Sequence, residues 1–599
     1  MGSVVAFLAR EAPDADAVER MAAAAPHRGA HSRVHAIGCA AVGVTERAGR
    51  SDASLHADPG IAVAFSGSLD NAADLRAAWM GEDRGDGAST PAAIVAAGIR
   101  KLGIENAARL LRGPFAVVAS DGRALHAFRD HIGFEPLVYR EDARGLFVAT
   151  EVKQVVAGSG LRREPDLEVL EKIFHRQLDD DARCAISGVL HLLPARVLTH
   201  EEGRTSLRRY WDPESLLETS RLEHRDIQER FDELMVRSVG RCMTGSDVVS
   251  LSGGVDSPAV AAFAAPIHRD RTGRALPALS VLFPDHPSVD ETRYIEAVAN
   301  QLGLPLHTLQ FTARSTDDLD RWTWLFDGPV PTVAFSQIHE FLLAAGALGF
   351  GNILSGEQEE FLFEMRSGVL PYMVARGRLI PAWRYVRARR ARGDSLRQVV
   401  KVLAMGVTPA WVRTAFRSDR RAGVPAWIDR DRVKTYKASP ASRRWREAQL
   451  TAFTGTGLHL PADNAIQALA GVTERRPFAD IDLVEFTLGL RAETKHGDLR
   501  HKGFLRSLLR GRVPAIILDR WDKTVFNEFI LANLDYPALR RWLVAPPGPP
   551  IPGVRYDVLA ERLERETLTL PEYMQAKDLA CIHAFLSQWE NGWGSRSGK

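Results

Sequence analysis

Ser252-Gly-Gly-Val-Asp-Ser257 is the stretch of sequence that decides the fold of this chain. An apolar run, Val248-Val-Ser-Leu251, comes directly before it, and Pro258-Ala-Val-Ala-Ala-Phe-Ala-Ala265 comes directly after it. The apolar run is typical of a buried strand, and the second run is typical of a helix with proline in its first turn. The sequence therefore predicts a strand that passes through a tight glycine turn into a helix.

The residues of this turn are suited to binding phosphate. Gly253 and Gly254 let the backbone approach an anion, while backbone N–H groups at the helix N-terminus and the hydroxyls of Ser252 and Ser257 would hold its oxygens. Asp256 is well placed to hold magnesium. A turn that only needs glycine and caps a helix is the structural alternative, but six residues in this order between a strand and a helix argue against it.

The loop is similar to the pyrophosphate loop of ATP pyrophosphatases, which cleave ATP between its α- and β-phosphates. It differs from the GxxxxGK[ST] loop, which grips the β- and γ-phosphates with a lysine. Residues 279–283 and 352–354 predict further strands, and helical segments separate them. Such alternation indicates a parallel α/β sheet.

Composition limits the class of protein. At 599 residues the chain is long enough for about two to four domains, and 45% hydrophobic with 25% charged residues is typical of a soluble globular protein. A net charge of +2 is too small to indicate a protein that binds nucleic acid or a membrane surface through its overall charge. No apolar run is long enough to span a bilayer. The four cysteines lie far apart, which excludes a disulfide scaffold and fits a reducing compartment, so we expect a cytoplasmic protein.

The chain divides near residue 213. Short apolar runs bounded by turn residues at 61–65, 115–119, 146–149 and 195–199 predict strands, and helical periodicity begins near residue 227. We therefore predict two domains, 1–212 and 213–599. In the second domain, residues 376–446 contain 20 Lys or Arg and four Asp. Such a segment is usually a solvated face; the alternatives are a surface that binds an acidic peptide or partner and a surface that binds nucleic acid.

Four further stretches resemble, in order, motifs of the asparagine synthetase superfamily. They are Phe128-Arg-Asp-His-Ile-Gly-Phe-Glu-Pro-Leu-Val-Tyr139, Gly188-Val-Leu-His-Leu-Leu-Pro194, Arg208-Arg-Tyr-Trp-Asp-Pro213 and Arg476-Pro-Phe-Ala-Asp-Ile-Asp-Leu-Val-Glu-Phe486. The resemblance implies an N-terminal Ntn-hydrolase-like αββα glutaminase-type domain. It implies next an adenine-nucleotide-hydrolase (PP-loop ATPase) α/β synthetase domain with a helical C-terminal part. The stretch after about residue 530 carries no recognised motif.

The glutaminase-type domain lacks its nucleophile. Members that hydrolyse glutamine begin Met-Cys-Gly, whereas Gly2 stands here and has no nucleophilic atom. Two other pocket motifs of the family are altered: Ser66-Gly-Ser-Leu-Asp-Asn71 stands in place of NGEIYN, and Pro91 aligns with the acidic residue of GSD. Only His27-Arg-Gly29 still resembles its family motif, HRGPD. Cys39 is a possible substitute, although a lone cysteine between apolar neighbours is usually a core residue. We predict no glutaminase activity and a structural role.

The resemblance also implies the synthetase site. Ser355-Gly-Glu-Gln-Glu-Glu-Phe-Leu-Phe363 takes the place of SGEGxDExF, so Glu357 matches the residue proposed to act on the incoming amine. Glu360 falls where the second magnesium-binding Asp usually sits. Gln358 and Glu359 replace the two small residues of the turn, so Glu359 is an alternative ligand. An acidic helix start favoured by the helix dipole is the structural alternative.

A lysine and a set of backbone contacts complete the implied site. Leu518-Asp-Arg-Trp-Asp-Lys-Thr-Val-Phe-Asn527 resembles R-x-K-x-x-F, which implies that Lys523 contacts phosphate oxygens and the anionic intermediate. Adenine recognition in this family is mostly by backbone, which places it near Leu251, Val281, Ser355 and Gly356. The implied cofactors are ATP and Mg²⁺.

Because the N-terminal domain is not expected to supply ammonia, we expect the attacking amine to belong to the substrate. Synthetases of this build without the cysteine resemble two groups, the β-lactam and carbapenam synthetases and the lasso peptide macrolactam synthetases. The β-lactam synthetases carry Tyr where Glu357 stands. Our leading prediction is therefore macrolactam closure of a lasso precursor peptide, with a leader peptidase and a leader-binding protein as partners. Ammonia-dependent asparagine synthetase, a β-lactam synthetase-like enzyme, a tRNA-modifying ATP pyrophosphatase and a non-catalytic scaffold remain as alternatives.

Overall fold

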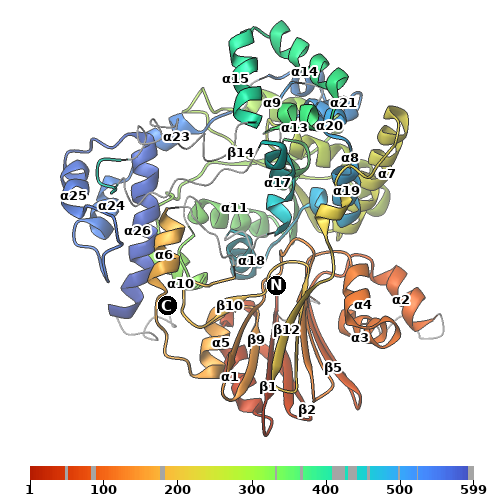
Figure 1. Ribbon diagram of the computed structural model, residues 1–599, viewed down its shortest axis with the longest axis vertical. Helices are drawn as coiled ribbons and strands as arrows, with labels where there is room; N and C mark the ends of the chain where they lie inside the picture. The colour runs from red at the N-terminus through yellow and green to blue at the C-terminus, as the bar shows by residue number, and fades with distance from the viewer. Residues whose placement is uncertain are drawn as a thin grey trace.

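The computed structural model describes residues 1–47, 52–81, 90–175, 182–330, 334–364, 368–407, 425–429, 441–454, 459–496, 499–521 and 524–590. Figure 1 shows a β-sandwich formed by the N-terminal part and a larger body of helices around a small sheet. The chain passes from one to the other after β12, through the short 3₁₀ helix η2 (Pro213–Leu216). Within the described residues, no helix is both long and apolar enough to cross a membrane.

Two six-stranded antiparallel sheets form the sandwich. The first has the order β10 (Leu190–His191), β8 (Val138–Asp142), β9 (Gly145–Ala149), β1 (Ser3–Ala9), β3 (Ala40–Glu46), β2 (His31–Ile37). The second has the order β12 (Arg204–Arg209), β11 (Arg196–Glu201), β7 (Leu125–Arg129), β6 (Phe115–Ser120), β5 (Ile61–Gly67), β4 (Ala53–Asp58). Alternate side chains of the facing strands, such as Val4, Ala6 and Val118, meet in one apolar core between the sheets.

Helices cover both outer faces of the sandwich. On the first sheet pack α1 (Ala15–Ala23) and α5 (Val152–Ser159), and on the second pack α2 (Ala72–Met80), α3 (Pro91–Leu102) and α4 (Ile104–Leu110). The αββα layering that the sequence predicted is confirmed. The four runs predicted as strands at 61–65, 115–119, 146–149 and 195–199 lie in β5, β6, β9 and β11.

A five-stranded, wholly parallel sheet lies at the centre of the second body. Its order is β15 (Leu306–Leu309), β14 (Ala278–Val281), β13 (Asp247–Ser250), β16 (Asn352–Leu354), β17 (Thr473–Arg475). The predicted strand before the glycine loop is β13, in the middle, and the predicted helix after it is α8 (Asp256–Thr272). The loop therefore opens at the carboxyl edge of the sheet, where ligands of parallel α/β folds bind.

Helices surround this sheet. They are α7 (His224–Cys242), α9 (Thr292–Leu302), α10 (Leu319–Leu325), α11 (Phe335–Ala347), α12 (Glu359–Phe363), α13 (Val369–Ala375), α14 (Leu379–Ala391), α15 (Leu396–Val407), α17 (Ala441–Thr454), α18 (His459–Ala470), α19 (Ile481–Gly489), α20 (Ala492–His496), α21 (Gly503–Leu508), α22 (Ala515–Leu518) and α23 (Asn527–Ala532).

The C-terminal stretch without a recognised motif folds into α24 (Tyr536–Leu543), α25 (Tyr556–Glu564) and α26 (Leu570–Glu590). In Figure 1 the long helix α26 runs beside α10 and beside α6 (Leu167–Phe174) of the N-terminal domain. Leu579 and Phe585 of α26 belong to the same buried cluster as Phe7 and Phe147 of the sandwich. The C-terminal helices therefore tie the two domains together.

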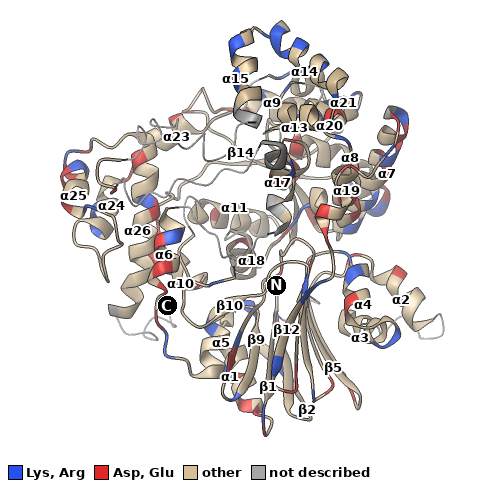
Figure 2. Ribbon diagram, viewed as in Figure 1, with Lys and Arg blue, Asp and Glu red and all other residues tan. Residues whose placement is uncertain are grey.

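The basic segment 376–446 lies only partly within the described residues. Figure 2 shows Lys and Arg gathered on α14 and α15, at the end of the molecule far from the sandwich. Several of these cations are paired: Arg378 binds Glu218 at 2.5 Å, and Arg446 binds Glu214 at 3.1 Å. The predicted acidic-partner surface stays a prediction.

Candidate active site

The predicted phosphate loop is fixed to the sheet by hydrogen bonds on both sides. Leu251 donates its backbone N–H to Leu279 of β14 at 2.9 Å, and the Ser280 hydroxyl donates to the Leu251 carbonyl at 2.7 Å. The Ser252 N–H donates to the Ser257 hydroxyl at 2.9 Å, which closes the turn. No described side chain caps the N-terminus of α8, so its N–H groups point at the place where an anion would bind.

An ion pair braces the loop from the outside. Glu291 accepts the Gly253 N–H at 2.9 Å and pairs with Arg520 at 2.8 Å, and Arg520 also donates to the Gly253 carbonyl at 2.9 Å. Thr524 donates to the same Glu291 carboxylate at 2.6 Å. Lys523, the predicted catalytic lysine, lies outside the described residues, but its neighbours Arg520 and Thr524 are both held against the loop.

Two carboxylates and a lysine meet at the first turn of α8. The Lys502 ammonium lies 2.5 Å from Asp256 Oδ2 and forms a second ion pair with Glu359. Burial and the neighbouring Asp256 carboxylate raise the pKa of Glu359 well above its usual range. Among the described residues, Asp256 Oδ1 and Glu359 Oε1 are buried without a hydrogen-bond partner.

This pair fits the implied magnesium. Mg²⁺ is usually held by one or two carboxylates together with substrate phosphates, and two oxygens without hydrogen-bond partners beside a phosphate loop supply that donor set. Within the described part of the chain no group of three or more His, Cys, Asp or Glu forms a self-contained metal site. The structure brings Glu359, the alternative ligand, to Asp256. Predicted ligand Glu360 instead lies close enough to Glu357 and His459 to influence their charge.

Glu357 belongs to a second acidic cluster on the β16–β17 side of the loop. Arg476 pairs with Glu474 at 2.7 Å and with Asp463 at 2.9 Å. Solvent reaches the Glu357 side chain, but the surrounding protein desolvates it and the Glu474 carboxylate repels its charge, so its pKa rises to about 7. A carboxylate with that pKa can exchange a proton near neutral pH, as the predicted role of Glu357 requires.

Ser355 and Gly356 join the two clusters. The Ser355 N–H donates to the Arg475 carbonyl at 3.0 Å, which fixes it to β17. Gly356 lies so close to the start of α8 that a Cβ atom there would stand 2.6 Å from the Ser257 nitrogen. Together with Leu251 and Val281, these residues place all the predicted adenine contacts on one edge of the sheet.

A cavity of about 360 Å³ opens from the loop on the β14–β15 side. Leu251, Ser252 and Val281 line it near the loop, aromatic rings line its walls, and Tyr573, Met574 and Lys577 of α26 line its far end. The cavity is large enough for a bound nucleotide or another small organic molecule.

The position of the missing nucleophile is closed. A Cβ atom on Gly2 would stand 2.6 Å from the Ala53 Cβ and closer still to the Thr45 carbonyl oxygen. Cys39 cannot take over, because its carbonyl bonds Ala9 at the far end of β1, seven residues from Gly2 and about 20 Å away at the rise of a strand. Neither position therefore supplies the thiol, and Pro91 begins α3.

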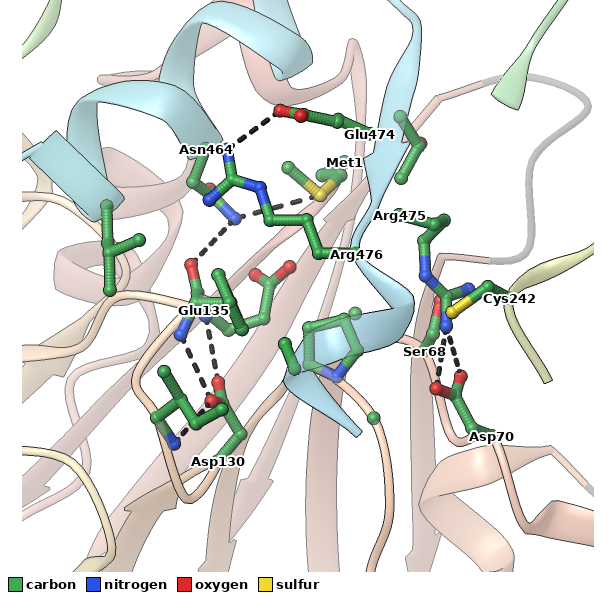
Figure 3. A pocket seen from close by; sticks show the side chains of 18 of the residues that line it. Met1, Ser68, Asp70, Asp130, Glu135, Cys242, Asn464, Glu474, Arg475 and Arg476 are labelled. Atoms are coloured by element: carbon green, nitrogen blue, oxygen red, sulfur yellow. Dashed lines mark hydrogen bonds and ion pairs between the residues drawn. The ribbon is translucent and has the colours of Figure 1, made fainter. Parts of the chain in front are cut away.

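The pocket between the domains is filled by polar contacts rather than by a reaction site. Figure 3 shows Arg475 of β17 reaching Asp70 of the sandwich, with two oxygens at 2.6 and 2.7 Å, while Arg476 points the other way toward Glu474. About 90 Å³ remains open there. Buried Asp70 has its pKa raised to about 6 by desolvation, which the Arg475 guanidinium opposes.

Sequence reasoning missed Lys502, Glu291 and Lys577. Lys502 and Glu291 lie far from the loop in sequence, and only the packing of α21 and α9 against α8 brings them close. Lys577 lies in the stretch without a motif. An isolated Lys or Glu carries no pattern that distinguishes it from a solvated surface residue.

A sandwich of the amidotransferase type joined to a sheet with a pyrophosphate loop defines a two-domain ligase. The asparagine synthase family model matches residues 230–546, and the glutamine amidotransferase domain model matches residues 1–211. The chain belongs to the asparagine synthase family, whose members are ATP-dependent ligases.

The chain is similar to several known proteins. The chain is 24% identical over 452 residues to "Asparagine synthetase [glutamine-hydrolyzing] 3" of Bacillus subtilis, covering 70% of this chain and 68% of that protein. It is 28% identical over 264 residues to "Amidase chyE" of Penicillium rubens, covering 41% of this chain but only 39% of that protein. A solved structure titled "Structure of the allosteric regulatory enzyme of purine biosynthesis" aligns at 13% identity over 52% of this chain and 80% of that chain, with a TM-score of 0.27.

Proposed function

We propose that the protein is an AMP-forming amide ligase that adenylates a carboxylate side chain and couples it to an amine. The single observation that carries this proposal is the meeting of Asp256, Glu359 and Lys502 at the open N-terminus of α8. With Mg²⁺ held by the two carboxylates, a site of this kind would offset the charge of a departing pyrophosphate. Membership of a family of ATP-dependent ligases supports the same reaction.

Each cluster has a separate task in this reaction. The Ser252–Ser257 loop holds pyrophosphate oxygens, and Lys502, together with the predicted Lys523, offsets their charge. Asp256 and Glu359 would hold Mg²⁺, which supplies Lewis-acid stabilisation of the phosphate oxygens. Glu357 takes a proton from the attacking amine, and Arg476 keeps the surrounding carboxylates in place.

We further propose that the reaction closes the macrolactam ring of a lasso precursor peptide. Gly2 and its closed surroundings leave the N-terminal domain without the nucleophile that releases ammonia, so the amine belongs to the substrate. Glu357, in place of the Tyr of β-lactam synthetases, favours the macrolactam reaction over β-lactam formation. A leader peptidase and a leader-binding protein are the partners that such a reaction requires.

The test uses Mg²⁺-ATP and a leader-free peptide with an Asp or Glu near its seventh to ninth residue. We expect the peptide to lose one water in mass and AMP to be released, and we expect an N-acetylated peptide to be inert because it has no free α-amine. Amidation of free aspartate by ammonium, with peptides ignored, would favour an asparagine synthetase instead. Absence of ATP–pyrophosphate exchange with every carboxylate would exclude all the amide-ligase alternatives.

A further inference from the structure

Lys577 is a buried cation without a partner. Its side chain is only 4% exposed, and among the described residues it has neither a hydrogen bond nor an ion pair. Burial lowers the pKa of Lys577, which the nearby Asp578 carboxylate only partly opposes. Burial of an ammonium group that forms no hydrogen bond or ion pair within the protein lowers the stability of the fold, unless a ligand binds the group.

The amine lies at a cavity that begins at the phosphate loop. Lys577 and Ser252 line the same space of about 360 Å³. The other charged residue that lines it, Glu291, is already satisfied by Arg520 and the Gly253 N–H. The unsatisfied charge of this cavity within the described residues is therefore that of Lys577.

The walls between the loop and Lys577 are largely aromatic. The Phe283 ring packs against the Phe529 ring at 4.9 Å and the Phe526 ring at 5.5 Å between centroids, and Phe311, Phe341 and Tyr573 also line the cavity. Faces of this kind stack on a planar base, and an ammonium can bind the same base at its edge or over its face.

We propose that Lys577 recognises the base of the bound nucleotide by donating a hydrogen bond to a purine ring nitrogen. The proposal rests on the proposed function, because it assumes that the loop binds the phosphates of the same nucleotide. It assigns the base contact to α26, which lies beyond residue 546, where the family match ends. Lys577 thus adds a charged contact to a pocket whose other walls are mainly aromatic side chains.

The test measures binding to the full-length chain by calorimetry in the presence of Mg²⁺, with ATP and with pyrophosphate. Lys577→Met keeps the length of the side chain and removes the donor, and relief of the buried charge should keep the variant folded. We expect it to bind ATP about tenfold to hundredfold more weakly, as for loss of a hydrogen bond from a charged group, and to bind pyrophosphate within about twofold of the unchanged protein.

Purine analogues then locate the contact. We expect the unchanged protein to lose affinity for one of 1-deaza-, 3-deaza- and 7-deaza-ATP, and Lys577→Met to bind that analogue and ATP equally well. Lys495→Met is the matched control: Lys495 is equally buried, bonds Gln449, and does not line the cavity, so ATP affinity should be unchanged.

Three results would contradict the base contact alone, and a fourth would contradict the proposed function as well. Unchanged ATP affinity in Lys577→Met, an equal loss for pyrophosphate, or equal binding of ATP and all three analogues by the unchanged protein would each overturn the base contact. If the unchanged protein binds pyrophosphate but no ATP, the proposed function fails as well.

Discussion

Gly2 and Gly254 differ in the space around them, and this difference bears on the function of each site. At Gly2 the space that a cysteine side chain would need is closed, because Ala53 and Thr45 occupy it. At Gly254, by contrast, the nearest atom to an added Cβ is the Ser252 hydroxyl at 3.5 Å, so the space is open. A closed position indicates packing, and an open position in a phosphate loop indicates room for a ligand.

Gly2→Cys should not restore glutamine hydrolysis, because the added side chain collides with the strand beside it. Incubation with glutamine should release no glutamate, and both Gly2→Cys and Gly2→Ala should melt at a lower temperature, since each adds the same Cβ. The double variant Gly2→Cys, Ala53→Gly should recover part of that loss. Glutamate released by Gly2→Cys alone would contradict this account of the N-terminal domain.

Gly253→Ala and Gly254→Ala should fail in different ways. At Gly253 the new Cβ would stand 2.9 Å from the Glu291 Cβ and 3.0 Å from the Tyr294 Cβ, so we expect a loss of about 1–3 kcal/mol in stability. Gly254→Ala should keep the unliganded melting temperature but lose most of the stabilisation by Mg²⁺-ATP, because its methyl group lies where phosphate approaches. Thermal unfolding with and without Mg²⁺-ATP distinguishes the two, and equal behaviour would argue against a phosphate loop.

At the scale of elements, α12 decides which acid faces the phosphate loop. Gln358 starts the helix from a left-handed conformation with φ of 74°, which non-glycine residues rarely adopt. From this start, neighbouring residues point in different directions because successive helical side chains are about 100° apart. Glu359 therefore reaches Asp256 and Lys502, and Glu360 faces Glu357 and His459.

Glu359→Gln should reduce Mg²⁺-dependent ATP–pyrophosphate exchange by at least about a hundredfold, as is usual for loss of a group that stabilises transition-state charge. Glu360→Gln, its neighbour on the same helix, should stay within about fivefold of the unchanged protein. The readout is exchange of labelled pyrophosphate with a peptide that the unchanged enzyme accepts. The opposite pattern would assign the metal to Glu360, as the sequence motif predicted.

Strand β17 links the two domains to the site. Its last residue, Arg475, reaches Asp70 of the sandwich, and the next residue, Arg476, points the opposite way to Glu474 and Asp463 beside Glu357. The N-terminal domain, although it lacks its nucleophile, therefore holds the strand on which the second acidic cluster is built. This gives a physical reason for the structural role that the sequence predicted.

For the molecule as a whole, burial of His131 at the junction of the domains couples stability to pH. The ring lies 5.1 Å from Tyr210 and 5.6 Å from Trp211, and burial, aided by the Arg112 charge, lowers the pKa of His131 to about 3. The unfolded chain, with an ordinary pKa near 6.5, binds this proton more readily. Stability from this group is therefore complete above about pH 6.5 and falls as the pH drops toward 3.

We expect His131→Phe to reduce the acid sensitivity of the fold. Between pH 7 and pH 5 the protonation cost of one such histidine is about 2 kcal/mol, and the variant should lose that part of the shift in melting temperature. His31→Phe, at an exposed position, is the control and should keep the full shift. An unchanged pH dependence in His131→Phe would show that the pKa of His131 is the same in the folded and the unfolded chain.

The sequence by itself determined the sheet, the loop and the loss of the nucleophile. These follow from local patterns: an apolar run, two glycines and a helix start at 248–265, alternating strands in the first two hundred residues, and Gly2 in place of cysteine. Each is fixed by neighbouring residues, since backbone conformation and strand burial depend on short-range sequence.

Only the tertiary structure decided which side chains meet. Lys502 reaches Asp256 from 246 residues away, Glu359 rather than Glu360 pairs with Lys502 because of the direction in which α12 begins, and Lys577 reaches the cavity because α26 packs across both domains. Single charged residues carry no local pattern, and their position depends on how distant helices pack. Long-range packing is thus what turned a recognisable loop into a site with a defined set of charges.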